Sequence, residues 1–334
     1  MRRAANRPPE QRGLARDQVR LLVATPDGLA HARFADLPRL LRPGDLLVVN
    51  TSATLPAAVA GSYGTAGPAR PVTVHFSTPL DDGTWLVELR GADLGRFRDA
   101  EPGQTVALPA GASVTLLARY PERDADRLWL ATVTAGDVPG YLAGHGQPVR
   151  YSYVPGRWPL ADYQTVFSRD PGSAEMPSAG RPLTARLVTD LIAAGVAIAP
   201  VTLHTGVGSL EAGEAPLPER FDVPAPTAAL VNLTRAAGHR VVAVGTTVTR
   251  ALESAAGPDG ELRPRRGWTS LVLGAGRPAR AVTGLVTGWH DPEASHLSLL
   301  EAVAGRALVT AAYAEADRHG YLGHEFGDSC LLLP

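Results

Sequence analysis

The sequence predicts an α/β protein in which both ends of the chain form a large layered α/β domain and a small all-β, barrel-like domain is inserted between them. From about residue 151, helix-patterned stretches alternate with apolar runs, as in layered α/β folds. Residues 58–148 instead hold short alternating segments between Gly, Pro and Asp turns, which is typical of a small barrel or sandwich. We therefore expect residues 1–57 and 151–334 to form the α/β domain and residues 58–150 the barrel.

The N-terminal part is expected to supply the first strands of the large domain. Residues 1–15 have the composition of a flexible lead-in, and strands are expected at 19–25 and 30–34 on either side of the turn "PDGL". A short helix or loop then leads to the apolar run "LLVVN", which predicts a buried strand ending at Asn50.

The C-terminal part is expected to alternate helices with strands. Helices are predicted at 184–195, 227–238 and 297–320, and strands at 196–203, 240–245, 269–274 and 281–287. The glycine-rich "GAGRPA" at 274–279 is followed by strand pattern, whereas a dinucleotide-binding loop must open into a helix. A hairpin turn is therefore the favoured interpretation of that segment.

Composition excludes two classes of chemistry. The 334 residues include no lysine, so the chain has neither a Walker A phosphate loop nor a Schiff-base lysine. A formal net charge of −1 gives no global positive field for nucleic acid. Cys330 is the single cysteine, so no intrachain disulfide can form. No apolar run approaches the length of about 18 residues that a membrane span needs. The cytoplasm is the expected compartment.

The segment "HRVVAVGTTVTRALESAAG", residues 239–257, predicts a buried strand, a turn and a helix. Such a turn, here Gly245, Thr246 and Thr247, often holds an anionic or nucleotide-like ligand in α/β proteins. Arg250 and Glu253 follow on the helix and are three residues apart, so they share a face. They are expected either to contact a ligand or to pair with each other.

Two histidines are placed at the ends of expected strands. "VTLHTGVGSL" brings His204 to a strand end, where Gly206 and Gly208 allow close approach of a ligand to the backbone. "TGWHDP" places His290 at another. Because ligands of α/β sheets bind at one edge, both histidines are expected to converge there, the alternative being simple packing roles.

No metal site is expected from the spacing of the histidines. His290 and His296 are six residues apart, and His319 and His324 are five apart, so neither pair has the i, i+4 spacing of a helical zinc site. A serine hydrolase is also disfavoured, because no G-x-S-x-G motif occurs. The long irregular segment 162–180 is interpreted either as a functional loop or as a linker between domains.

Eight motifs in one order resemble the S-adenosylmethionine:tRNA ribosyltransferase-isomerase family, which forms epoxyqueuosine. The resemblance runs from about Arg16 to Leu332. It implies a large α/β domain with an inserted barrel, as the segmentation also predicts. The motifs are "RDQVRLL" (16–22), "LLRPGDLLVVN" (40–50), "DYQTVFS" (162–168), "PSAG" (177–180), "VTLHTGVGSL" (201–210), "VVAVGTTVTRALESAA" (241–256), "TGWHDP" (287–292) and "FGDSCLL" (326–332).

The resemblance also implies a reaction and its site residues. S-adenosylmethionine would be the co-substrate, no metal would be needed, and the ribosyl group would pass to a 7-aminomethyl-7-deazaguanine in a tRNA with a GUN anticodon. A base must remove a proton beside the sulfonium and an acid must protonate the leaving adenine, roles that fall to His204 and His290. Groups that would bind the substrate are Tyr163, Gln164, Thr165, Thr205, Gly206, Gly208, Gly245, Thr246, Thr247, Arg250, Glu253 and Asp328.

The chain also departs from the family pattern. Pro182 stands where a histidine is expected, Glu219 is kept without its two neighbouring histidines, and Ala53, Ala58 and Glu293 replace cationic residues. Fewer cations weaken the expectation of phosphate contacts. Two alternatives therefore accompany the family function: a divergent paralogue that uses a small deazapurine acceptor, and a non-catalytic S-adenosylmethionine-binding protein.

Overall fold

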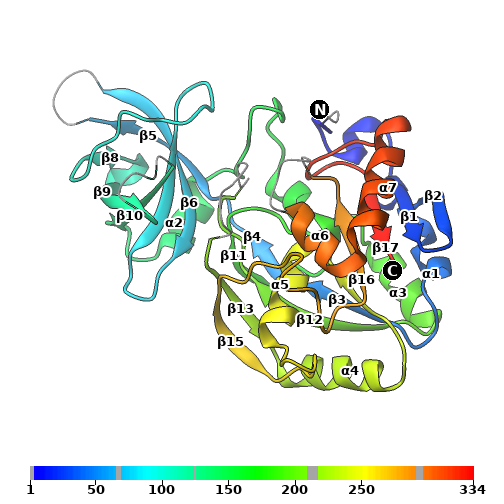
Figure 1. Ribbon diagram of the computed structural model, residues 1–334. Helices are drawn as coiled ribbons and strands as arrows, with labels where there is room; N and C mark the ends of the chain where they lie inside the picture. The colour runs from blue at the N-terminus through cyan, green and yellow to red at the C-terminus, as the bar shows by residue number, and fades with distance from the viewer. Residues whose placement is uncertain (1–3, 65–68, 123–124, 126, 209–216, 291–295) are drawn as a thin grey trace.

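The computed structural model describes residues 4–334 except 65–68, 123–124, 126, 209–216 and 291–295. A β-barrel lies to one side of a larger body in which helices cover a sheet (Figure 1). The large body contains both the first and the last strands of the chain, so the predicted fold class is confirmed.

A nine-stranded sheet forms the centre of the large body, in the order β15-β13-β12-β3-β14-β16-β17-β1-β2. Its four central strands β12, β3, β14 and β16 are parallel, whereas β17 runs antiparallel to β16. The strand bounds are β1 Arg20–Thr25, β2 Gly28–Arg33, β3 Leu46–Asn50, β12 Ala197–Leu203, β13 Glu219–Val223, β14 Val241–Val244, β15 Arg265–Thr269, β16 Gly284–Gly288 and β17 Ser329–Leu332.

Helices cover both faces of this sheet because its strands are apolar on both sides. In β14, Val241 and Ala243 face the core under one group of helices, while Val242 and Val244 face a second core on the opposite side. The helices are α1 Leu37–Leu40, α3 Ala185–Ala193, α4 Ala225–Ala236, α5 Thr246–Ala255, α6 His296–Ala304 and α7 Arg306–Arg318.

Six strands close the barrel in the order β10-β7-β6-β5-β8-β9. Their inward side chains form a separate core that includes Val59, Val74, Phe76 and Trp129. The bounds are β5 Ala58–Tyr63, β6 Arg70–Pro79, β7 Trp85–Arg90, β8 Thr105–Ala107, β9 Ser113–Tyr120, β10 Leu128–Val133 and, beside the barrel, α2 Val138–His145. The proposed limits of 58 and 150 for this domain stay a prediction.

A small junction lies between the two bodies. β4 (Ser52–Thr54) follows β3 and pairs in parallel with β11 (Asp170–Ser173), which belongs to the long segment 162–180. The N-terminal residues also pack here: Ala5 is buried with Phe326, and its backbone N–H donates to the Gly323 carbonyl over 3.0 Å. The expectation of a flexible lead-in is therefore wrong for residues 4–15.

Two of the predicted elements differ locally from the structure for simple reasons, and a third predicted segment is confirmed. The strand expected at 269–274 lies at Arg265–Thr269, because Thr269 pairs with Glu219, the first residue of its neighbour β13. The helix expected at 297–320 is interrupted at Gly305, whose φ of 77° is left-handed. "GAGRPA" forms a turn closed by Gly274 and Arg277, as predicted.

None of the helices in the described part of the chain combines the length and apolar character needed to cross a membrane. Glu293, which replaces an expected cation, lies outside the described residues.

Candidate functional site

Several of the predicted residues lie at one edge of the large sheet, at the ends of its parallel strands. Asn50 is the last residue of β3, and His204, Gly245 and His290 follow β12, β14 and β16. β17 starts at the same edge because Ser329 pairs with Gly288. The expected convergence of the two histidines is therefore confirmed at the level of the sheet. Two strands, β3 and β14, lie between β12 and β16, so the backbones of β12 and β16 are about 14 Å apart.

Gly245 shapes the turn that starts α5. Its φ of 98° and ψ of 159° lie in a region that essentially only glycine adopts. A Cβ there would also come within 3.3 Å of the Ala179 side chain, in the loop at Ser178–Gly180. The turn therefore holds the 177–180 loop close to the first residues of α5, where backbone N–H groups face outward.

His204 is held by a short series of hydroxyl groups. Its Nδ1 lies 2.8 Å from Ser52 Oγ, which lies 2.6 Å from Ser173 Oγ, and both serines are fully buried. Gly172 leaves space for the imidazole, since a Cβ there would approach Nδ1 to 2.4 Å. Burial lowers the pKa of His204; the charge of Asp170 opposes this effect and that of Arg220 adds to it. His204 is therefore neutral at pH 7 and able to accept a proton.

The turn after His204 contacts Glu175 and the barrel together. Thr205 Oγ1 donates to the Glu175 carbonyl over 2.6 Å, and the Gly208 N–H donates to the Glu175 carboxylate over 3.1 Å. A Cβ on Gly206 would lie 2.6 Å from Ser77 Oγ of β6, so the barrel packs directly on this turn. Burial raises the pKa of Glu175, and hydrogen bonds from Tyr151 and Gly208 partly counteract it.

Four aromatic rings run from the barrel to the C-terminal segment, and we call them the aromatic series: His75, Tyr151, Tyr153 and His324. Their successive centroids are 6.3, 5.9 and 4.1 Å apart, and the last two contacts are stacked. His324 adopts a left-handed φ of 67°, which is uncommon for a residue with a side chain. Strained residues of this kind concentrate at functional sites.

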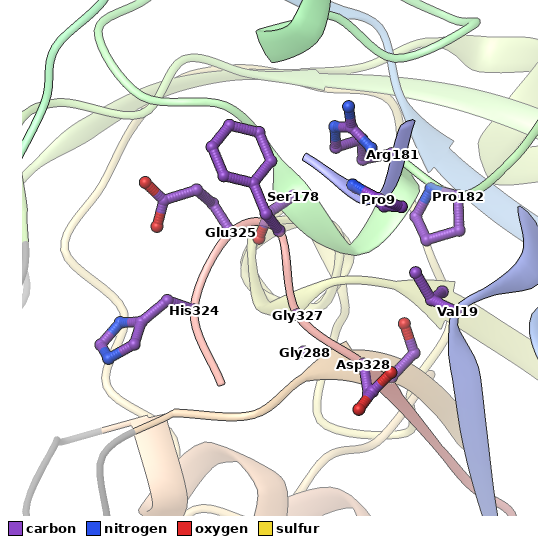
Figure 2. Close-up of a pocket in the computed structure, with 12 residues that line it drawn as sticks. Pro9, Val19, Ser178, Arg181, Pro182, Gly288, His324, Glu325, Gly327 and Asp328 are labelled. Atoms are coloured by element: carbon purple, nitrogen blue, oxygen red, sulfur yellow. The ribbon is translucent and has the colours of Figure 1, made fainter. Parts of the chain in front are cut away.

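A pocket opens beside the aromatic series, between the N-terminal segment, the 178–182 loop and residues 324–329 (Figure 2). Gly288 at the end of β16 also lines it, so it belongs to the same sheet edge. The predicted residue Asp328 lines the pocket as well, but its carboxylate is engaged. Its oxygens accept hydrogen bonds from the Arg20 backbone, the Arg20 guanidinium and the Leu322 N–H.

Glu325 lines this pocket, and the pKa of its carboxyl group is raised. Burial raises its pKa to about 7; hydrogen bonds from its own backbone and from Tyr153 lower it, and the charge of Glu175 raises it. At neutral pH the carboxyl group is therefore close to half protonated. Such a group can donate or accept a proton under physiological conditions.

His290 follows β16 at the same edge, and two strands separate β16 from β12, which His204 follows. Its Nε2 is 3.3 Å from Thr287 Oγ1, and its backbone N–H donates to the Tyr313 hydroxyl over 3.4 Å. The loop with Glu325 is tied to the neighbouring Trp289, whose carbonyl accepts from the His324 N–H over 3.2 Å. His290 thus adjoins the Glu325 loop, while His204 adjoins the barrel.

The predicted residues of the 162–168 motif anchor backbone. The Gln164 side chain bonds both the N–H and the carbonyl of Thr54, over 2.9 and 2.8 Å. Tyr163 packs edge-on against Phe326, and burial raises its pKa. Thr165 Oγ1 accepts from the Phe167 N–H over 3.2 Å. These contacts position the junction at the sheet edge.

Arg250 and Glu253 do not pair with each other, contrary to one of the two expectations. Arg250 forms a close ion pair with Glu219 and donates to the carbonyls of Leu217, Thr269 and Leu271. Its guanidinium is thereby largely engaged by protein groups. Glu219 is the acidic residue that the sequence keeps, and burial raises its pKa while the charge of Arg250 lowers it.

The expected substrate contact of Glu253 needs correction. This carboxylate is 0% exposed and accepts hydrogen bonds from the consecutive backbone N–H groups of Arg280, Ala281 and Val282, over 2.9 to 3.0 Å. It therefore stabilises the loop that leads into β16. Glu253 lies about two helical turns after Gly245, so its side chain is in the core and not at the sheet edge.

Comparison with known proteins identifies the family. A family model described as "Queuosine biosynthesis protein" matches residues 1–332. The chain belongs to the queuosine biosynthesis protein family. It is 38% identical over 339 residues to the S-adenosylmethionine:tRNA ribosyltransferase-isomerase of Acidiphilium cryptum, covering 95% of this chain and 93% of the relative. Its identity to the enzyme of the same name from Moorella thermoacetica is 36%, covering 95% and 94%.

A solved structure agrees with this family assignment. The crystal structure of S-adenosylmethionine tRNA ribosyltransferase from Thermotoga maritima matches with a TM-score of 0.53 and 28% identity, covering 99% of this chain and 96% of that chain. The resemblance seen in the ordered motifs is confirmed. This member of the queuosine biosynthesis family is accordingly an enzyme of the ribosyltransferase-isomerase type, and the two alternatives are not favoured.

Sequence reasoning missed several residues of this family member's candidate site. Glu175, Tyr151 and Glu325 carry no motif of their own, and only Glu175 falls in the segment 162–180 that was interpreted as a functional loop or a linker. One usable signal was present: "YSY" at 151–153 places two tyrosines with alternate spacing immediately after the barrel. Their function depends on contacts with residues far away in the chain.

Proposed function

We propose that this chain transfers and isomerises the ribosyl group of S-adenosylmethionine onto a 7-aminomethyl-7-deazaguanine in tRNA and releases adenine and methionine. The names of the relatives, which state both S-adenosylmethionine and tRNA, support this proposal. So does the structure's central observation: His204 and the Glu325 pocket, two sites suited to proton transfer near neutral pH, lie at one sheet edge.

We assign the base to His204. Its lowered pKa keeps the imidazole neutral, so it can remove the acidic proton next to the sulfonium. Its Ser52 contact fixes the orientation of the ring. The leaving adenine needs a proton, and Glu325 with a pKa of about 7 is the proposed donor, with His290 as the neighbouring alternative. The ends of β12 and β16 are about 14 Å apart, so His204 and His290 would approach the substrate from different sides.

The remaining predicted residues are proposed to shape the site mainly through backbone. Gly245, Thr246 and Thr247 would present the start of α5 to the sugar or the methionine group, as would Thr205, Gly206 and Gly208 from the opposite side. Tyr163, Gln164, Thr165 and Asp328 would hold the surrounding loops, because their side chains already bond to protein atoms. Arg250 would act through its ion pair with Glu219.

S-adenosylmethionine enters this proposal as a co-substrate, and no step of the reaction calls for a resident metal. The tRNA acceptor is preferred to a free deazapurine because of the names of the relatives. A tRNA substrate also supports the cytoplasm as the compartment. The domain limits at 57/58 and 150/151 belong to the same proposal, since all six barrel strands lie between them.

The test measures adenine released from S-adenosylmethionine in the presence of tRNA that carries the modified base in a GUN anticodon. His204→Ala should lower kcat by about a hundredfold or more, the usual contribution of a positioned base. His145→Ala is the matched control, because His145 is an exposed histidine at the end of α2.

Two outcomes would contradict the proposal. Wild-type turnover by His204→Ala would remove the assigned base. Equal adenine release with the free deazapurine and with the tRNA would instead favour the small-molecule acceptor.

A further inference from the structure

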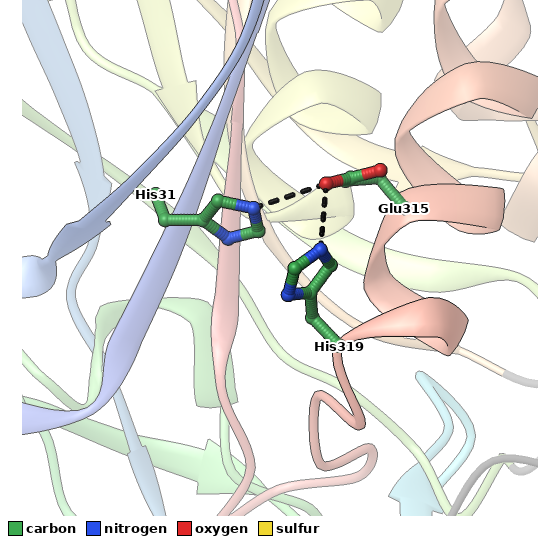
Figure 3. A group of neighbouring side chains, drawn as sticks. All are labelled: His31, Glu315 and His319. Atoms are coloured by element: carbon green, nitrogen blue, oxygen red, sulfur yellow. Dashed lines mark hydrogen bonds and ion pairs between the residues drawn. The ribbon is translucent and has the colours of Figure 1, made fainter.

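Three side chains that do not line the pocket of the candidate site converge on one another: His31, Glu315 and His319 (Figure 3). His31 projects from β2, the edge strand of the large sheet, whereas Glu315 and His319 lie at the end of the last helix. Both Nε2 atoms lie close to Glu315 Oε1, at 3.1 Å for His31 and 3.0 Å for His319. We call these residues the His–Glu–His cluster.

The spacing of the cluster fits a small divalent cation. One ligand atom from each residue lies within 4.8 Å of the other two. Four ligands around zinc at bond lengths of about 2.1 Å are about 3.4 Å from one another, so the observed separations need only small adjustments of side chains. Imidazole nitrogens select zinc, nickel or copper over magnesium or calcium, which prefer oxygen ligands.

Tyr321 orients the cluster in the way that metal-binding histidines are usually oriented. Its hydroxyl lies 2.8 Å from His31 Nδ1, which leaves Nε2 directed at Glu315. The Tyr321 side chain is itself fixed, since it is 1% exposed and packs edge-on against Trp289. A second partner on the far nitrogen of a ligand histidine sets its tautomer and raises metal affinity.

Nearby charges leave the required carboxylate oxygen available. Arg318 pairs with Glu315 Oε2 over 2.6 Å, whereas both histidines approach Oε1. The Arg318 side chain is 70% exposed, so water screens its repulsion of a bound cation. Hydrogen bonding from His31, and then the charge of Arg318, lowers the pKa of Glu315, which keeps the carboxylate ionised.

We propose that the His–Glu–His cluster binds one transition-metal ion of the zinc class and thereby clamps edge strand β2 to helix α7. Neutral His31 would bind through Nε2, and its ring proton would move to Nδ1, where it donates to the Tyr321 oxygen. Three protein ligands leave one position for water. A search for paired histidines alone misses this site, because the helical i, i+4 pair is Glu315 with His319.

The experiment titrates zinc chloride into tag-free, chelator-treated protein by calorimetry, with cobalt absorption as an independent readout of coordination. Wild type and the exposed-histidine control His145→Ala should each bind one equivalent with micromolar or tighter affinity. His31→Ala and His319→Ala should each weaken binding by at least about tenfold.

Two further variants separate metal binding from simple hydrogen bonding. Glu315→Gln keeps an oxygen that accepts from both histidines but removes the charge, and it should also weaken zinc binding. Tyr321→Phe keeps the ring and removes the orienting hydroxyl, so a loss of about tenfold is expected. Zinc should raise the Tm of the wild type and leave that of His31→Ala unchanged.

The proposal is overturned if the wild type binds no zinc at micromolar concentration, or if the cluster variants bind as tightly as His145→Ala. Its outcome is independent of adenine release, because the cluster lies outside the candidate active site.

Discussion

The Tyr151 hydroxyl donates a hydrogen bond to the Glu175 carboxylate, which also accepts from the Gly208 N–H. Tyr151 follows the barrel, Glu175 belongs to the junction segment, and Gly208 follows β12 of the large sheet. One carboxylate thus joins three parts of the chain that meet at the candidate site. Burial raises its pKa, and the two donors partly offset that effect.

Tyr151→Phe should destabilise the protein because it removes a donor from a partly buried carboxylate. Hydrogen bonds to charged groups contribute about 1.5–3 kcal/mol, and we expect a loss of about 2 kcal/mol in the free energy of unfolding. The pKa of Glu175 should rise further, since the Tyr151 bond lowers it. Urea denaturation measures the first effect.

Tyr141→Phe is the matched control for this prediction. The Tyr141 hydroxyl donates to the Pro109 carbonyl over 3.0 Å, but this contact is exposed. Its removal should change the free energy of unfolding by no more than about 0.5 kcal/mol. Equal effects of the two substitutions would show that the Tyr151–Glu175 contact contributes no more to the free energy of unfolding than an exposed contact does.

Glu325 predicts a specific dependence of stability on pH. Its pKa is about 7 in the folded protein and near 4.5 for an ordinary glutamate. Between these values the folded state keeps a proton that the unfolded state has lost. The free energy of unfolding contributed by this group therefore falls as pH rises from about 4.5 to about 7, and it is constant above that range.

Glu325→Gln should remove this component, because an amide does not titrate. Urea denaturation of wild type and variant at several pH values should give a difference that changes only within that interval. A constant difference across the interval would mean that Glu325 has an ordinary pKa. It would also remove the basis for Glu325 as the proton donor.

How much the sequence predicts depends on whether a residue acts through local or distant contacts. Gly245 and His204 were predictable, since a strand end followed by glycine places both at the edge of a parallel sheet. The barrel was predictable for the same reason, because alternation and turns are local patterns.

The residues whose roles the sequence analysis misjudged have partners far away in the chain. Arg250 and Glu253 share a helix face, which favours a mutual pair, yet Arg250 binds Glu219, 31 residues away, and Glu253 binds backbone 27 to 29 residues away. Tyr151 and Glu175 likewise bond to each other although they are 24 residues apart. Helical spacing contains no information about such partners.

Glu253 gives the last prediction, because its two interpretations have different consequences. Glu253→Gln removes the charge and places an NH₂, which cannot accept, beside the Arg280 N–H, while the remaining amide oxygen can still accept from the three consecutive N–H groups. Hydrogen bonds to charged groups contribute about 1.5–3 kcal/mol and neutral ones about 0.5–1.5 kcal/mol, so we expect a loss of about 2 kcal/mol in the free energy of unfolding.

The KM for S-adenosylmethionine should stay unchanged in the folded fraction of Glu253→Gln, since the side chain is enclosed by the loop before β16. Glu261→Gln is the control, because Glu261 is exposed and its contact with Arg263 is long, at 4.0 Å. A Glu253→Gln protein with wild-type stability and a raised KM would restore the substrate-binding role. A destabilised protein with unchanged KM shows instead that this carboxylate stabilises the loop and does not bind the substrate.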